Sequence, residues 1–178
     1  MTTTEKRIEY LRSHVRDVAD FPKPGIMFKD ITPLLANSRA LATAIDLFAE
    51  RFGDARIDTI VGIESRGFLF AAPLAVRLGA GFVPARKPGK LPHTTHRVSY
   101  DLEYGTDSLE LHTDAIRPGA RVLLVDDVIA TGGTAWAAAE LVRRQGGELL
   151  GAAFLLELLF LPGRARIAPV ESFSLLTY

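Results

Sequence analysis

The stretch VLLVDDVIATGGT, residues 122–134, decides the fold of this chain. Its first four residues are apolar and typical of a buried strand, and two adjacent carboxylates, Asp126 and Asp127, follow where that strand is expected to end. A glycine-containing turn comes next, and the alanine-rich residues 135–144 predict a helix. The stretch therefore predicts strand, turn and helix in direct succession, the building unit of an α/β sheet.

The turn over residues 130–134 has the chemistry of a phosphate site. Its two glycines let the backbone approach an anion without a Cβ clash, and its two threonines add hydroxyl donors. The free N–H groups and the dipole of the following helix favour negative charge at the same point. The carboxylates before the turn repel phosphate, but they suit the hydroxyl groups of a ribose that carries it. The alternative is an ordinary βα turn with an acidic patch.

Two other phosphate-binding motifs are absent from the sequence. The chain contains neither the Gly-x-x-x-x-Gly-Lys-Ser/Thr motif of a P-loop nor the Gly-x-Gly-x-x-Gly fingerprint of dinucleotide-binding proteins. The motif over residues 122–134 is therefore of a different kind.

Composition limits the class of protein. At 178 residues and 48% hydrophobic content, we expect one domain over residues 1–178. The net charge is zero and there is no cysteine, so nucleic-acid binding, disulfides and thiolate chemistry are not indicated. The N-terminus lacks the apolar core of a signal peptide, and the longest apolar stretch, 151–161, is too short to cross a bilayer. We therefore expect a cytoplasmic protein with no nucleic-acid or membrane partner.

Helical and strand-like patterns alternate along the chain. We expect an α/β fold with a doubly wound, mainly parallel sheet flanked by helices. The expected elements are helices over 5–18, 38–52, 66–78 and 135–144, strands over 59–63, 82–85, 121–128, 148–156 and 172–177, a loop over 21–28, and a hairpin with strands 98–104 and 109–112 around Gly105.

Polar chemistry follows three of these strands, and in a parallel sheet such loops gather at one edge. Residues 64–68 open a helix and offer a second anion site with serine and arginine donors. Residues 86–92 place three cations within five residues. Two anion sites beside a basic loop suit a ligand with a separate monophosphate and pyrophosphate. Ordinary βα loops and a solvated basic loop are the alternatives.

Residues 122–134 resemble the signature that type I phosphoribosyltransferases use for phosphoribosyl pyrophosphate (PRPP). Four further segments are similar to those of the adenine phosphoribosyltransferases, and they occur in the same order along nearly the whole chain. They are 21–33, similar to a segment that covers the base, 64–68, similar to a pyrophosphate loop, 86–92, similar to an Arg-Lys-x-Gly-Lys-Leu-Pro loop, and 99–105, similar to a mobile catalytic loop.

This resemblance implies the type I phosphoribosyltransferase fold, with a small base-covering hood within residues 1–35 and a mobile β-hairpin loop. The implied reaction joins adenine and PRPP to give AMP and pyrophosphate, with Mg²⁺ carried mainly by substrate oxygens and no metal ligands of the protein. The implied assembly is a homodimer. The alternatives are an enzyme that transfers the phosphoribosyl group to another purine and a PRPP-sensing regulator without activity. Such a regulator would be expected to carry a DNA-binding domain, which neither the length nor the charge of this chain suggests.

The resemblance also implies a role for individual residues. The implied catalytic residues are Glu103, Tyr104 and Arg66. The ribose and 5′-phosphate are assigned to Asp126, Asp127, Ala130, Thr131, Gly132, Gly133 and Thr134; the pyrophosphate to Glu64, Ser65, Arg66, Arg86, Lys87 and Lys90; and adenine to Ile26, Met27, Phe28 and Leu158.

Three residues depart from the family pattern. His93 and His96 have the spacing of a metal pair, but no third ligand is evident, and a solvated loop is the preferred interpretation. Trp136 follows the phosphate turn at a position where a smaller residue is usual, and we expect it to pack in the core or an interface.

Overall fold

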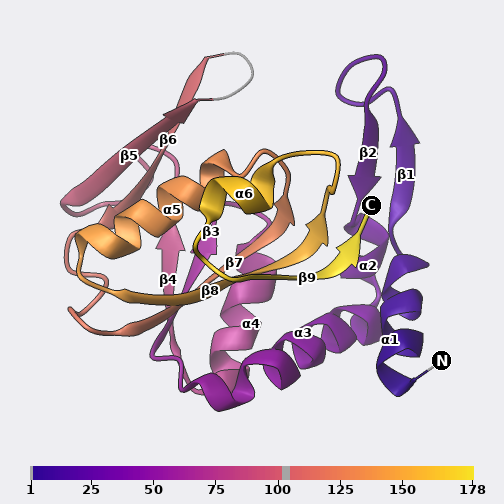
Figure 1. The fold of residues 1–178 in the computed structure, drawn as a ribbon, viewed down its shortest axis with the longest axis horizontal. Coiled ribbons are helices and arrows are strands. Elements are labelled where there is room, and N and C mark those ends of the chain that lie inside the picture. The colour runs from indigo at the N-terminus through magenta and orange to yellow at the C-terminus, as the bar shows by residue number, and fades with distance from the viewer. Residues whose placement is uncertain (1, 102–104) are drawn as a thin grey trace. The chain divides into compact units, whose positions relative to one another are not determined.

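The computed structural model describes residues 2–101 and 105–178 (Figure 1). The chain divides into two compact units, residues 1–47 and 48–178, and each is described by itself.

The N-terminal unit pairs two short strands between helices. It contains α1 (Thr3–Arg12), β1 (Arg16–Ala19), β2 (Met27–Asp30), α2 (Thr32–Ala36) and most of α3 (Ser38–Phe52). The strands β1 and β2 are antiparallel, with Val18 opposite Phe28 and Ala19 opposite Met27. The ring of Phe28 packs edge-on against that of Phe21, with 5.0 Å between centroids.

Two sequence expectations for this unit were wrong. The helix expected over 5–18 ends at Arg12, where the Ser13 hydroxyl donates 2.8 Å to the Tyr10 carbonyl and closes the last turn. The residues expected in a loop over 21–28 include the start of β2. The first error arises because the apolar Val15 and Val18 fit a helical spacing as well as a strand.

The C-terminal unit is built on a five-stranded parallel sheet. Its strand order is β4-β3-β7-β8-β9, and every neighbouring pair is parallel. The strands are β3 (Thr59–Ile63), β4 (Gly81–Ala85), β7 (Arg121–Ile129), β8 (Glu148–Glu157) and β9 (Ser172–Thr177). The expectation of a mainly parallel α/β sheet is confirmed.

Helices cover both faces of this sheet. A Cβ added at Gly62 would meet Ala71 of α4 (Phe68–Leu78), while the alternate residues Val61 and Ile63 pack in the core with α5 (Gly133–Arg144). The connection from β3 leads to β4 and the connection from β7 leads to β8, in opposite directions along the sheet. The boundary between β3 and β7 is thus the topological switch point, where ligands bind in such sheets.

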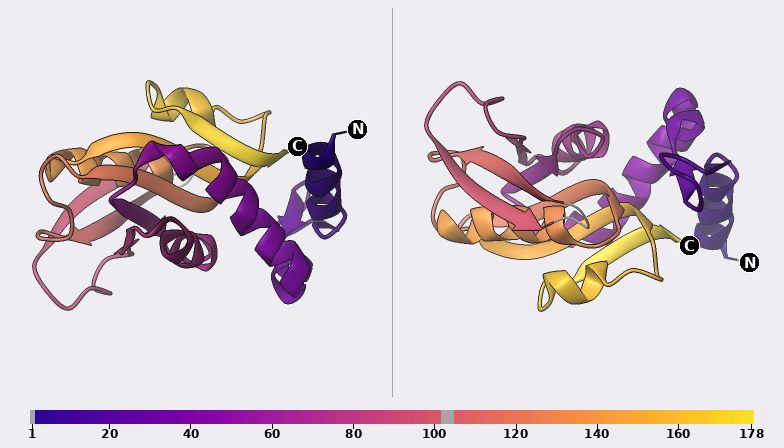
Figure 2. Two further views of the ribbon diagram at one scale, coloured as in Figure 1. Left: turned by 90° about the horizontal axis from the view of Figure 1, so that it is seen from below. Right: turned by 90° about the horizontal axis from the view of Figure 1, so that it is seen from above.

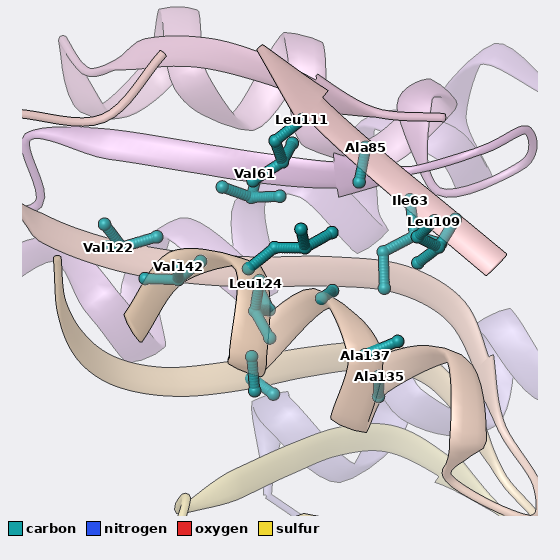
Figure 3. Close-up of a cluster of buried hydrophobic side chains, with 14 of the residues drawn as sticks. Val61, Ile63, Ala85, Leu109, Leu111, Val122, Leu124, Ala135, Ala137 and Val142 are labelled. Atoms are coloured by element: carbon teal, nitrogen blue, oxygen red, sulfur yellow. The ribbon is translucent and has the colours of Figure 1, made fainter. Parts of the chain in front are cut away.

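An antiparallel hairpin packs alongside α5. It consists of β5 (Thr95–Asp101) and β6 (Thr106–His112). The hairpin lies beside α5 in Figure 1 and in both views of Figure 2. Its Val98 side chain belongs to the core formed by β3, β7 and α5. Leu109 and Leu111 join the same core and are labelled in Figure 3. The strand β6 begins at Thr106 rather than at Leu109, because residues 106–108 pair with 99–101.

A short helix and a 3₁₀ turn complete the fold. The helix α6 (Gly163–Ile167) lies between β8 and β9 and was not expected from the sequence, and the 3₁₀ helix η1 covers Gly53–Ala55. Trp136 is half-buried against the core, as expected. Within the described residues, no helix combines the length and apolar character needed to cross a bilayer.

Candidate active site

A pocket of about 370 Å³ opens at the switch point, where β3 and β7 end. It is lined by the loop after β3, by one lysine after β4, and by the turn between β7 and α5. The lining residues are Glu64, Ser65, Arg66, Lys87, Asp126, Asp127, Val128, Ile129, Ala130, Thr131, Gly132, Gly133, Thr134 and Ala135.

The paired carboxylates lie at the floor of this pocket. The strand β7 pairs with β3 only as far as Val125 but continues beside β8, so Asp126 and Asp127 stand where the sheet opens on one side. Both side chains are buried, and the Asp127 N–H donates to Asp126 Oδ1 at 2.8 Å. Arg66 Nε lies 2.6 Å from Asp127 Oδ2. The loop after β3 and the acids of β7 are therefore joined by an ion pair.

Burial dominates the electrostatics of Asp126. Burial, together with the neighbouring Asp127 carboxylate, raises the pKa of Asp126 well above the usual value of an aspartate. Arg66 acts in the opposite direction and does not offset the burial. The raised pKa limits the negative charge that the pair presents to a phosphorylated ligand.

Glu64 forms hydrogen bonds and ion pairs with the basic loop over residues 86–92. Its Oε2 accepts hydrogen bonds from Arg86 Nε at 3.2 Å and from the Lys87 N–H at 2.8 Å, and Lys90 Nζ lies 3.8 Å from Oε1. Burial acts to raise the pKa of Glu64, but these hydrogen bonds and cations outweigh it, and the pKa lies below its usual value. Glu64 therefore remains ionised and acts as the counter-ion of the loop.

The turn over 130–134 has the shape expected for a phosphate site. Gly132 has φ +78°, and a Cβ on it would lie 2.5 Å from the Gly163 carbonyl oxygen of α6. The side chain of Arg166 borders the turn, since its Nη1 is 3.4 Å from the position of a Cβ on Gly133. The helix α5 begins at Gly133, so its first N–H groups are available at the pocket.

A further carboxylate–arginine pair, Glu157 with Arg164, anchors α6. Arg164 donates twice to Glu157, from Nε at 2.9 Å and from Nη2 at 2.6 Å. This pairing lowers the pKa of Glu157 although burial acts to raise it. Gly163 and Arg166 of this segment border the phosphate turn, and the Gly163-Arg164 pattern was the only sign of that role in the sequence.

A hydroxyl of the hairpin reaches the pocket as well. Tyr100 Oη accepts hydrogen bonds from Lys87 Nζ at 3.0 Å and from Thr134 Oγ1 at 3.1 Å, and it donates to Asp107 Oδ2 at 3.2 Å. Lys87 also forms an ion pair with Asp107. Burial acts to lower the pKa of Lys87, but the bonds to Asp107 and Tyr100 outweigh it and raise the pKa. Sequence reasoning missed Tyr100 and Asp107, which lie seven residues apart and meet only across the hairpin.

The structure brings most of the predicted site residues together. The lining of the pocket includes all seven residues predicted for the ribose and 5′-phosphate, and four of those predicted for pyrophosphate: Glu64, Ser65, Arg66 and Lys87. Arg86 and Lys90 turn toward Glu64 and do not line the pocket. Leu158 is bonded to the neighbouring strand, its N–H donating 3.1 Å to the Ile129 carbonyl.

The remaining predicted residues fall elsewhere. Ile26, Met27 and Phe28 belong to the N-terminal unit, where Ile26 precedes β2 and the other two are its first residues. Glu103 and Tyr104 lie outside the described residues.

Candidate metal ligands do not cluster in the described ranges, 2–101 and 105–178. In these ranges no three His, Asp or Glu side chains converge in a way that would hold an ion. The His93 ring packs against that of His112, with 6.0 Å between centroids, and the backbone N–H of His93 donates 3.3 Å to His112 Nε2.

The arrangement supplies three kinds of contact within one pocket. A helix start with threonine hydroxyls can hold a monophosphate, and the adjacent acids can accept hydrogen bonds from sugar hydroxyls. Arg66 and Lys87 can neutralise a second anion on the side of β3 and β4. A sugar held between two separate anionic groups fits this sequence of contacts.

Comparison with known proteins agrees with this geometry. The phosphoribosyl transferase domain family matches residues 30–171. The chain is 62% identical to the adenine phosphoribosyltransferase of Sorangium cellulosum over 93% of this chain and 82% of that one.

Solved structures extend the likeness. The adenine phosphoribosyltransferase of Thermoanaerobacter pseudethanolicus superposes with a TM-score of 0.93 at 50% identity, over 96% of this chain and 99% of that one. The Saccharomyces cerevisiae enzyme, solved with adenine and an imino-altritol bisphosphate, superposes with a TM-score of 0.92 at 43% identity, over 96% and 99%. The chain belongs to the adenine phosphoribosyltransferases of the type I phosphoribosyltransferase family.

Proposed function

We propose that this enzyme transfers the phosphoribosyl group of PRPP to adenine, giving AMP and pyrophosphate. The observation that carries the proposal is the pocket at the β3–β7 switch point, where a phosphate turn, a buried acid pair and two cations line one cavity. The Saccharomyces cerevisiae relative has been solved with adenine and a bisphosphate, which supports this pairing of ligands.

The phosphoribosyl half of the ligand is assigned to β7 and α5. The N–H groups and hydroxyls of residues 131–134 hold the 5′-phosphate, and Asp126 and Asp127 accept hydrogen bonds from the ribose hydroxyls. Both contacts leave the sugar C1 free to react. The chemistry of this half is therefore positioning, since the protein forms no covalent bond to the sugar.

The leaving pyrophosphate is assigned to the loops after β3 and β4. As the bond from C1 to the pyrophosphate oxygen breaks, negative charge develops on that oxygen and positive charge on the sugar. Arg66 and Lys87 line the pocket on this side, and Ser65 adds a hydroxyl donor. Arg86 and Lys90 belong to the same basic loop and pair with Glu64 without lining the pocket.

The adenine assignments follow from the resemblance to the family. Backbone groups of residues 26–28 read the base, Leu158 packs near it, and residues 1–35 form the hood of a single phosphoribosyltransferase domain. Adenine loses its N9 proton as N9 bonds to C1, and Glu103 with Tyr104 is assigned to proton handling on the ring. These assignments rest on the resemblance of the two segments to the family.

Mg²⁺ is the expected cofactor, and the charges of the pocket fit it. PRPP would bring several negative charges into a cavity that already contains the carboxylates of Glu64 and Asp127 and the Asp126 carboxyl, whose pKa is raised, beside two cations, Arg66 and Lys87. A divalent ion carried on substrate oxygens offsets this surplus of negative charge and stabilises the leaving pyrophosphate. The protein residues beside it hold the ribose and neutralise the remaining charge.

We also propose a cytoplasmic homodimer, the assembly that the resemblance to the family implies. Lys90 is exposed and does not line the pocket of its own chain, as expected of a cation that reaches the site of a second copy. Sedimentation should give the mass of two chains. Mixing an Arg86→Ala with a Glu103→Ala variant should restore part of the activity through hybrid sites, and a fully active monomer would contradict the dimer.

The test of the proposed function is a base panel with PRPP. Turnover with adenine should produce AMP and pyrophosphate in equal amounts, and guanine, hypoxanthine and xanthine should react far more slowly. Preferred turnover of another purine would assign a different base. Binding of PRPP without turnover of any base would favour a PRPP-sensing regulator.

A further inference from the structure

The hydroxyl of Tyr100 is the point where the two anion sites of the pocket meet. Lys87 lines the pyrophosphate side of the cavity and Thr134 lines the 5′-phosphate side. Both side chains donate to the same oxygen, at 3.0 Å and 3.1 Å. Tyr100 does not itself line the pocket, and its side chain is 4% exposed.

Packing fixes this hydroxyl in place. The ring of Tyr100 belongs to the buried core between the hairpin and α5, and its Cδ2 lies 2.9 Å from the position of a Cβ on Gly133. A tyrosine ring held on both sides moves its hydroxyl very little. The oxygen is thus a fixed point, whereas the lysine and threonine that donate to it have rotatable ends.

Asp107 completes the arrangement as the acceptor of the Tyr100 O–H. It lies 3.2 Å from that oxygen, forms an ion pair with Lys87, and is itself oriented by the Ser108 N–H at 2.7 Å. A tyrosine oxygen that accepts from two donors and donates to a carboxylate has its hydrogen-bonding capacity in use. The hydroxyl therefore has a defined orientation.

We infer that Tyr100, oriented by Asp107, is a positioning residue that sets the lysine of the pyrophosphate site and the threonine of the 5′-phosphate site at a fixed separation. This inference rests on the proposed function, because it assigns the two sites to the two ends of PRPP. Its consequence is that one hydroxyl outside the pocket affects the binding of both phosphate groups and not the binding of adenine.

Tyr100→Phe removes this hydroxyl and keeps the buried ring. Calorimetry should show AMP and pyrophosphate each binding about three- to tenfold more weakly, the usual loss for one hydrogen bond, with adenine unchanged. The KM for PRPP should rise more than kcat falls. Tyr10→Phe is the matched control, since it removes a hydroxyl that donates to Asn37 at 3.3 Å. It should change neither the affinity for AMP nor the affinity for pyrophosphate.

Double variants separate positioning from a general structural effect. If Tyr100 acts through Thr134, adding Tyr100→Phe to Thr134→Val should not lower the affinity for AMP further. If Tyr100 acts through Lys87, adding Tyr100→Phe to Lys87→Met should not lower the affinity for pyrophosphate further. Thermal unfolding of each variant measures any common loss of stability, which would lower both affinities in every background.

The outcomes are distinct. Unchanged AMP and pyrophosphate affinities in Tyr100→Phe, or fully additive losses in both double variants, would overturn the inference while leaving the proposed function intact. Failure of the wild-type protein to bind AMP and pyrophosphate would instead overturn the proposed function.

Discussion

Arg66 Nε lies 2.6 Å from Asp127 Oδ2, so the loop after β3 and the acids of β7 form one electrostatic unit. The arginine belongs to the side assigned to pyrophosphate, and the aspartate to the side assigned to ribose. The pair therefore lies between the two halves of the proposed ligand, where the bond to the leaving group breaks.

The Asp127→Asn variant tests this relationship. Loss of a charge-assisted hydrogen bond costs about 1.5–3 kcal/mol, so the Kd for PRPP should rise about ten- to hundredfold, while adenine binding is unchanged. Calorimetry with each ligand alone is the measurement. Asp54→Asn, on the exposed η1 segment, is the control for removal of one charge. Equal weakening of both ligands would contradict the ribose assignment.

Asp126 predicts an unusual dependence of stability on pH. Its pKa is raised by burial in the folded chain, so the folded state binds more protons than the unfolded state once the pH exceeds the ordinary value of 3.8. The free energy of unfolding therefore falls as the pH rises from 3.8 through the folded pKa, and this loss persists at neutral pH.

Asp126→Asn should remove that loss. Its Tm should exceed that of the wild type at pH 7, by about 2–4 °C for each kcal/mol of relieved burial, and the difference should shrink toward pH 4. PRPP binding should weaken in the same variant. Asp114→Asn, at an exposed position, should leave both quantities unchanged. A Tm gain that is the same at pH 4 and pH 7 would argue against a buried charge.

We expect different effects of alanine at two glycines that have nearly the same positive φ. Gly132 has φ +78° and Gly119 has φ +76°, but only a Cβ at Gly132 meets other atoms, 2.5 Å from the Gly163 carbonyl oxygen. In both alanine variants the free energy of unfolding should fall by about 1–2 kcal/mol because of backbone strain. In Gly132→Ala it should fall by about 1–3 kcal/mol more, and the affinity for AMP should fall about tenfold.

Equilibrium unfolding and AMP titration of these two variants provide the comparison. Gly119→Ala should bind AMP like the wild type. If Gly132→Ala also binds AMP normally, the 5′-phosphate is held elsewhere.

We expect substitution of Glu103 to lower kcat without changing the affinity for PRPP. If it handles a proton of adenine, Glu103→Leu should lower kcat by about 10²–10⁴, the usual range for a general acid or base. The Kd for PRPP should change little, because the turn and the acids are untouched. Glu140→Leu on α5 is the matched control. Near-normal turnover would make Glu103 a surface residue, and a large loss of PRPP affinity would assign it to binding or folding.

The site was predictable where chemistry follows a buried strand. The apolar runs 59–63 and 122–125 are recognisable without tertiary information, and the polar residues after them must gather at one sheet edge. All seven residues predicted for ribose and 5′-phosphate accordingly line one pocket. The resemblance to the family then supplied the identity of the ligand.

The rest depends on contacts between residues far apart in the chain. The bond from Thr134 to Tyr100 spans 34 residues, and nothing local distinguishes Tyr100 from any core tyrosine. The strands β1 and β2 have four residues each, too few for alternation to be recognised. The helix α6 has five residues and is fixed mainly by the Glu157–Arg164 pair rather than by its own propensity.

The most direct test of the account is a crystal structure of this protein with AMP and pyrophosphate bound. The account predicts the AMP phosphate on the N–H groups of residues 131–134, the ribose hydroxyls on Asp126 and Asp127, and pyrophosphate on Arg66 and Lys87. A phosphate of AMP found away from the turn, or pyrophosphate bound without contact to Arg66 or Lys87, would contradict the central assignment of the site.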